Sequence, residues 1–82
     1  MALELFHRIV DPGSARVRKL VAERELNPDV KFRNVEFDEP RAKLLGLGGD
    51  GTTPALWDGE KLFVGADAVI ARLLAHLDVG RG

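Results

Sequence analysis

The residues best able to do chemistry stand in one short segment, Arg8-Ile9-Val10-Asp11-Pro12-Gly13-Ser14, which follows an apolar run at residues 3–6. Asp11 could serve as a general acid or base, and Ser14 as a nucleophile or hydrogen-bond donor. No second carboxylate or histidine is placed to work with Asp11, and nothing in the sequence offers Ser14 a base. An Asp-Pro pair is also typical of a helix start, with Asp11 as N-cap and Pro12 at the first helical position. Helix capping by Asp11 and an ordinary first-turn position for Ser14 are therefore the simpler roles.

Composition removes several classes of chemistry. The chain of 82 residues has no cysteine, no tyrosine and only two histidines, His7 and His76. Without cysteine there is no disulfide, no thiolate nucleophile and no thiolate metal ligand. The two histidines are far apart in sequence, so we expect no metal site and read both as packed or surface residues.

Charge and hydropathy describe an ordinary globular chain. The 12 Lys and Arg residues balance 13 Asp and Glu residues, which gives a net charge of −1. This balance disfavours nucleic acid as a partner. No apolar run approaches the roughly 18 residues of a membrane span, and no signal-peptide pattern is present. We expect a single domain over residues 1–82, without membrane contact and cytoplasmic.

Periodicity and turn residues predict seven elements in the order β-α-β-α-β-β-α. They are a strand at 3–6, a helix from Asp11 to Asn27-Pro28, a β-rich run at 30–37, a short helix from 38 into the glycines of 46–51, strands at 52–57 and 61–64 around Asp58-Gly59, and a helix capped by Asp67 and ending before Gly80. The alternation slips between Phe32 and Val35, which indicates a bulge or a late strand start. A βαβ unit followed by a hairpin and a helix predicts an α/β fold, a four-stranded mixed sheet with helices on both faces.

This order resembles the thioredoxin fold, and is most similar to glutaredoxins and to the N-terminal domain of glutathione S-transferases. The resemblance runs from Leu3 to about Leu77. Three patterns carry it: residues 8–14 in place of Lys-x-x-Cys-Pro-x-Cys, Thr52-Thr53-Pro54 in place of Thr-Val-Pro with a cis proline, and Val64-Gly65-Ala66-Asp67 in place of Gly-Gly-x-Asp. Residues 14–18 and 68–74 also look like transferase N-terminal domains.

The sequence differs from these families at the positions of their reactive cysteines. Asp11 stands at the position of the nucleophilic cysteine and Ser14 at that of the resolving cysteine, so residues 11–14 form a degenerate active-site motif. Family chemistry needs a thiolate, and a carboxylate cannot carry out thiol–disulfide exchange. We therefore expect no oxidoreductase activity. The helical C-terminal domain of the transferases, which supplies their second substrate pocket, is not expected either.

What the resemblance still implies is a binding surface for glutathione. Thr53, before Pro54, would pair its backbone with the cysteinyl unit, Asp67 with Ala66 would hold the γ-glutamyl end, and Arg8 would hold the glycyl carboxylate in bidentate fashion. Each residue also has a plain structural role. Pro54 would shape the loop that faces the first helix, Asp67 would cap the last helix, and Arg8 would be a solvated charge.

Three hypotheses about function remain. The first is a redox-inactive, non-catalytic binding module for glutathione, a related γ-glutamyl peptide or an extended protein segment. The second is a small transferase-like enzyme that uses Ser14 or Asp11. The third is a purely structural or protein-interaction domain with no small ligand. The missing cysteines favour the first and third, and none of the three requires a cofactor or a metal.

Overall fold

The sheet is built around β1 (Leu3–His7) in a computed structural model that describes residues 3–81. β1 pairs in parallel with β2 (Val30–Asn34) and antiparallel with β3 (Ala55–Trp57), and β3 pairs antiparallel with β4 (Leu62–Val64). The strand order is β2-β1-β3-β4. The predicted four-stranded mixed sheet is therefore confirmed.

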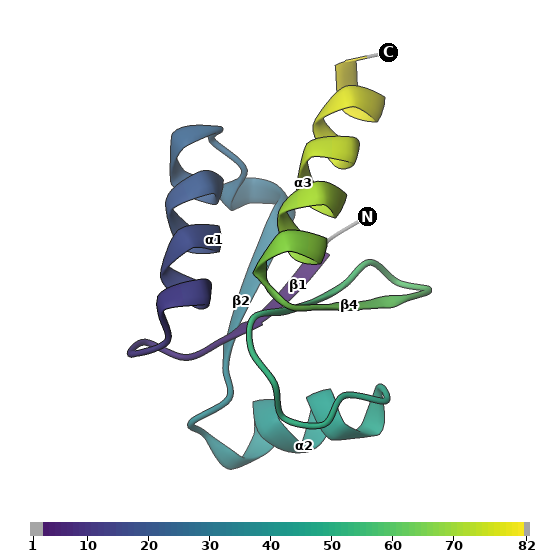
Figure 1. Cartoon of the computed structure of the whole chain (residues 1–82). Helices are drawn as coiled ribbons and strands as arrows, with labels where there is room; N and C mark the ends of the chain where they lie inside the picture. The colour runs from purple at the N-terminus through teal and green to yellow at the C-terminus, as the bar shows by residue number, and fades with distance from the viewer. Residues whose placement is uncertain (1–2, 82) are drawn as a thin grey trace.

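Helices cover both faces of this sheet (Figure 1). α1 (Pro12–Glu23) and α3 (Ala66–Arg81) lie on one face, and α2 (Asp38–Gly46) lies on the other. The core cluster between the sheet and the helices α1 and α3 comprises Leu3, Leu5, Val17, Val21, Leu26, Val30, Leu56, Val69 and Leu73. The smaller cluster under α2 comprises Phe6, Val35, Leu44 and Ala55. Alternation along β1 divides its side chains between the two clusters, so one strand joins the two halves of the core.

α1 begins where the sequence predicts and ends earlier. Asp11 is the N-cap, with extended backbone and a carboxylate that accepts a hydrogen bond from the Ser14 N–H. At the other end Glu25 adopts the left-handed region, with φ of 54°. This lets the N–H of Leu26 bond to the Val21 carbonyl at 2.8 Å and turns Leu26 into the core. Helix ends of this kind usually carry glycine, so no residue before Pro28 indicated that the helix would stop.

The slip in the alternation of residues 30–37 marks the end of β2, so the predicted bulge or late start is wrong. Register with β1 runs without interruption from Val30 to Asn34. Val35 lies beyond the strand and is buried under α2. Its side chain therefore does not follow the period of the strand that precedes it.

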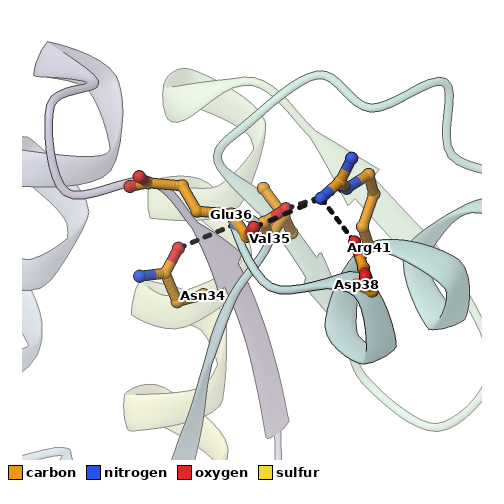
Figure 2. A network of polar contacts seen from close by, with 5 residues as sticks. All are labelled: Asn34, Val35, Glu36, Asp38 and Arg41. Carbon is orange, nitrogen blue, oxygen red and sulfur yellow. Dashed lines mark hydrogen bonds and ion pairs between the residues drawn. The ribbon is translucent and has the colours of Figure 1, made fainter.

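Arg41 fixes the connection between β2 and α2 (Figure 2). Its Nε donates to the Val35 carbonyl at 3.2 Å, and its Nη2 donates to the Glu36 carbonyl at 3.2 Å and to Asp38 Oδ1 at 3.1 Å. The Asn34 side chain accepts the Glu36 N–H at 2.9 Å. These contacts satisfy backbone groups that no strand or helix pairs.

α3 starts earlier and ends later than predicted. Ala66 is its first residue, so Asp67 lies in the first turn and is not the N-cap. Gly65, with φ of 95°, precedes the helix, and its carbonyl accepts the Val69 N–H at 3.0 Å. The helix also continues through Gly80, since a helical glycine costs only about 1 kcal/mol relative to alanine. Across residues 3–81 no helix has both the length and the apolar character needed to cross a membrane.

Candidate functional site

Three segments distant in sequence meet beyond the carboxyl end of β1: the start of α1, the connection into β3, and the start of α3. The Thr53 hydroxyl lies 3.0 Å from Asp11 Oδ2. A Cβ placed on Gly13 would lie 3.1 Å from Pro54 Cδ and 3.6 Å from Ala66 Cβ. The structure thus brings together five of the residues that the sequence singled out for this site.

The Asp11 carboxylate is held by uncharged donors. Its Oδ2 accepts the Ser14 hydroxyl at 2.7 Å, the Ser14 N–H at 3.1 Å and the Thr53 hydroxyl at 3.0 Å. The Ser14 hydroxyl is the largest cause that lowers the pKa of Asp11; burial opposes it, and Thr53 and the N–H groups of Ser14 and Gly13 lower that pKa further. Asp11 takes part in no ion pair within residues 3–81. It therefore presents an uncancelled negative charge.

Ser14 is part of the scaffold of this site. Its side chain is 0% exposed. The hydroxyl donates to Asp11 at 2.7 Å and accepts the Arg8 N–H at 3.2 Å. Both functions of the hydroxyl are therefore used within the protein, which fits a positioning role and leaves no hydrogen for a ligand.

Arg18 organises the segment that leads into the site, a role the sequence analysis missed. Its guanidinium donates to the carbonyls of Arg8 at 3.0 Å and Ile9 at 3.1 Å, and lies 3.1 Å from His7 Nδ1. Burial is the main cause that lowers the pKa of His7, and the charge of Arg18 lowers it further against an opposing effect of Glu36. A neutral His7 ring can accept the hydrogen bond from Arg18.

The signal for Arg18 was present in the spacing of α1. Residues four apart lie on the same helix face, and Arg18 follows Ser14 by four positions. The charge of Arg18 by itself is typical of a solvent-exposed helix face. Nothing in the sequence indicates that the carbonyls of the preceding loop turn back toward this arginine.

The charged residues expected to hold the ends of a ligand lie at the rim. The Arg8 side chain makes no hydrogen bond or ion pair within the described residues. The Asp67 side chain is 96% exposed and lies 3.5 Å from Arg16 Nη2. Such an exposed pair contributes about 0–1 kcal/mol, so Arg16 can release Asp67 at little cost.

Thr53 has free backbone groups at the centre of the site. The Thr53–Pro54 peptide bond is cis, and the Pro54 carbonyl accepts the Gly65 N–H at 2.9 Å. Across residues 3–81, neither the N–H nor the carbonyl of Thr53 is hydrogen-bonded. Backbone groups in such a position are paired by water or by a ligand. The same part of the chain holds no group of three or more His, Asp or Glu side chains that could bind a metal ion.

A comparison with solved structures identifies the fold. The crystal structure of a buckwheat glutaredoxin–glutathione complex is similar to this chain, with a TM-score of 0.63 and 23% sequence identity over 90% of this chain and 69% of that one. The chain therefore has the thioredoxin-like fold of glutaredoxins, as predicted. No protein-family model matches the chain, and no curated protein matches it. The likeness to transferase N-terminal domains stays a prediction.

Proposed function

We propose that this chain is a non-catalytic, glutaredoxin-like binding domain that holds glutathione, or another extended peptide, against the backbone of Thr53. The observation that carries the proposal is the pair of backbone groups on Thr53, its N–H and its carbonyl, which have no hydrogen-bond partner across residues 3–81. A peptide unit paired with Thr53 gains two hydrogen bonds, each with a net value of about 1 kcal/mol. The solved glutaredoxin that resembles this chain is a glutathione complex, which makes glutathione the first ligand to test.

The two ends of glutathione find groups of matching charge. The first turn of α3, at Ala66 and Asp67, has backbone N–H groups without helical partners and suits the γ-glutamyl carboxylate. The Asp67 carboxylate suits the ammonium group once Arg16 releases it. Arg8, whose side chain makes no hydrogen bond or ion pair within the described residues, suits the glycyl carboxylate.

The surroundings of Ser14 favour binding over catalysis. The chain has no cysteine, and therefore supplies no thiolate of its own. Ser14, the residue on which a transferase-like reaction would depend, is fully buried with both functions of its hydroxyl in use. A ligand surface without a thiolate, and with the Ser14 hydroxyl occupied, suits peptide binding and not catalysis.

A protein segment longer than glutathione is a second candidate ligand. Ile9 is 58% and Val10 is 84% exposed, and both lie in the loop that enters the site. Phe37, also exposed, follows Glu36, whose carboxylate accepts the Ile9 N–H at 3.3 Å. Exposed apolar residues beside a binding site would contact the residues of a longer segment.

The test measures the affinity of Arg8→Ala for reduced glutathione by amide chemical shifts, beside Arg24→Ala as a matched control. Arg24 lies at the opposite end of α1. Loss of the bond to the glycyl carboxylate should weaken binding about tenfold or more in Arg8→Ala, since hydrogen bonds to charged groups are worth about 1.5–3 kcal/mol. Arg24→Ala should bind like the wild type. Equal affinity of all three proteins, or no shifts in the wild type at millimolar glutathione, would contradict the proposal.

A further inference from the structure

We infer that Asp11 makes this site select a neutral hydrogen-bond donor and reject an anion at the ligand group that lies beside Thr53. The inference rests on the proposed function and specifies the form of the ligand. Glutathione would bind with its thiol protonated, and a thiolate or sulfonate in the same place would be excluded.

Asp11 lies close to the surface on which the ligand would be paired. Asp11 Oδ2 lies 3.0 Å from the Thr53 hydroxyl, and the backbone of Thr53 is the surface on which the ligand would be paired. The side chain of a peptide unit paired there therefore lies within a few ångströms of this carboxylate. Like charges this close together near a protein surface repel each other.

No cationic side chain is paired with Asp11 in residues 3–81. Its three hydrogen-bond donors are two hydroxyls and one backbone N–H, and none carries a full charge. Other carboxylates of the chain are paired: Asp67 with Arg16, and Asp58 with Arg72. The positive end of α1 offsets only part of the charge, since a helix N-terminus is equivalent to about half an elementary charge against a full charge on Asp11.

The charge of Asp11 also acts on the thiol of a bound glutathione. A helix N-terminus alone favours a thiolate and lowers the pKa of a thiol beside it. A carboxylate in the same place reverses the sign of the local potential, so the bound thiol has a raised pKa. The S–H group can then donate a hydrogen bond to Asp11, which an anionic group cannot do. Binding forms and breaks no covalent bond.

The test compares two ligands on three proteins. The ligands are reduced glutathione and its sulfonate, in which the cysteinyl S–H is replaced by a sulfonic acid group. The proteins are the wild type, Asp11→Asn, and Asp29→Asn as a control with the same change in net charge. Asn also caps helices well, so Asp11→Asn should fold. Asp29 lies just before β2, at the end of the sheet opposite Asp11.

We expect the wild type to bind the sulfonate about tenfold or more weakly than the thiol, a modest gap for like charges in partly exposed surroundings. The gap should close in Asp11→Asn and persist in Asp29→Asn. Equal binding of thiol and sulfonate by the wild type would overturn the inference and leave the proposed function standing. Failure of glutathione itself to bind would overturn both.

A pH series on the wild type gives a second measurement that needs no variant. Affinity for reduced glutathione should fall as pH rises through the thiol range, near 8.5. The analogue with a methyl group in place of the thiol should show no such fall. Parallel profiles for the two ligands would contradict the inference.

Discussion

Two partly buried carboxylates, Asp11 and Glu4, are held in opposite ways. Glu4 Oε1 lies 2.8 Å from Lys43 Nζ, and its Oε2 lies 3.2 Å from Arg33 Nε. These contacts tie β1 to β2 and α2 through two cations. Asp11, by contrast, accepts its three hydrogen bonds from uncharged groups of Ser14 and Thr53. One carboxylate joins structural elements, and the other faces the candidate site.

The causes of their lowered pKa values differ in the same way. Burial is the largest effect on Glu4 and raises its pKa, but the hydrogen bonds and charges of Lys43 and Arg33 together outweigh it. The Ser14 hydroxyl is the largest effect on Asp11, and it lowers that pKa without adding a charge. Cations stabilise an ionised carboxylate and cancel its charge, whereas uncharged donors stabilise it and leave the charge in place. A carboxylate held by uncharged donors is therefore a candidate for recognition of a ligand.

The largest effect on the uncharged hydrogen bonds of Asp11 is expected from Ser14→Ala. The change leaves the partly buried N–H of Arg8 without its partner and removes the Ser14 hydroxyl, the closest donor to Asp11. An unsatisfied buried group costs about 1–3 kcal/mol, so the free energy of unfolding in urea should fall by about 2 kcal/mol. The control is Thr52→Val at an exposed hydroxyl, which should change stability by less than about 0.5 kcal/mol. Equal losses in the two variants would show that Ser14 does not organise the site.

A smaller effect is expected at the other carboxylate, in Glu4→Gln. The amide keeps the shape of Glu4 but leaves Arg33 and Lys43 without an opposite charge. We expect a loss of about 1 kcal/mol, since hydrogen bonds to charged groups exceed neutral ones by about that amount. High salt should reduce the difference because it screens the wild-type pair. Glu60→Gln, in the exposed turn before β4, is the control, and a loss no greater than in that variant would contradict the account.

The smallest effect is the pH dependence that His7 adds. Its pKa lies below 6.5 in the folded protein, so its contribution to stability is present above 6.5 and is lost as pH falls toward the folded pKa. The unfolded chain takes up the proton first. In His7→Gln the free energy of unfolding should depend less on pH just below pH 6.5. The loss of stability in acid that comes from Asp11 and Glu4 should remain, because the pKa values of these groups lie below 3.8 and 4.5. If the slope of unfolding free energy against pH below pH 6.5 is the same in His7→Gln and the wild type, the fold does not hinder protonation of His7.

The order of elements could be predicted because several helix starts and turns carry a local signal. The Asp-Pro pair at residue 11 predicted the start of α1, and the Asp-Gly pair at residue 58 predicted the turn before β4. The end of α1 could not be predicted, since Glu25 adopts a backbone conformation that favours glycine. The early end of β2 was hidden because Val35 is buried by α2 and not by its own strand.

The resemblance singled out residues of the candidate site that the fold brings together, but it did not predict their contacts. Asp11, Gly13, Thr53, Pro54 and Ala66 were singled out from a resemblance, and the fold brings them together. The bond between the Thr53 hydroxyl and Asp11 crosses 42 positions of sequence, and no periodicity reports such a distance. The contacts of two arginines were missed for the same reason. These are the bonds of Arg18 to loop carbonyls and of Arg16 to Asp67.

The most direct test of the account follows one backbone group, the N–H of Thr53, as reduced glutathione is added. A new hydrogen bond should move its proton resonance downfield and slow its hydrogen exchange, in step with shifts at Arg8, Ala66 and Asp67. The exposed Gly59 N–H, in the turn before β4, should not change. If glutathione saturates the protein while the Thr53 N–H keeps its shift and its exchange rate, ligand pairing at Thr53, and with it the proposed site, is wrong.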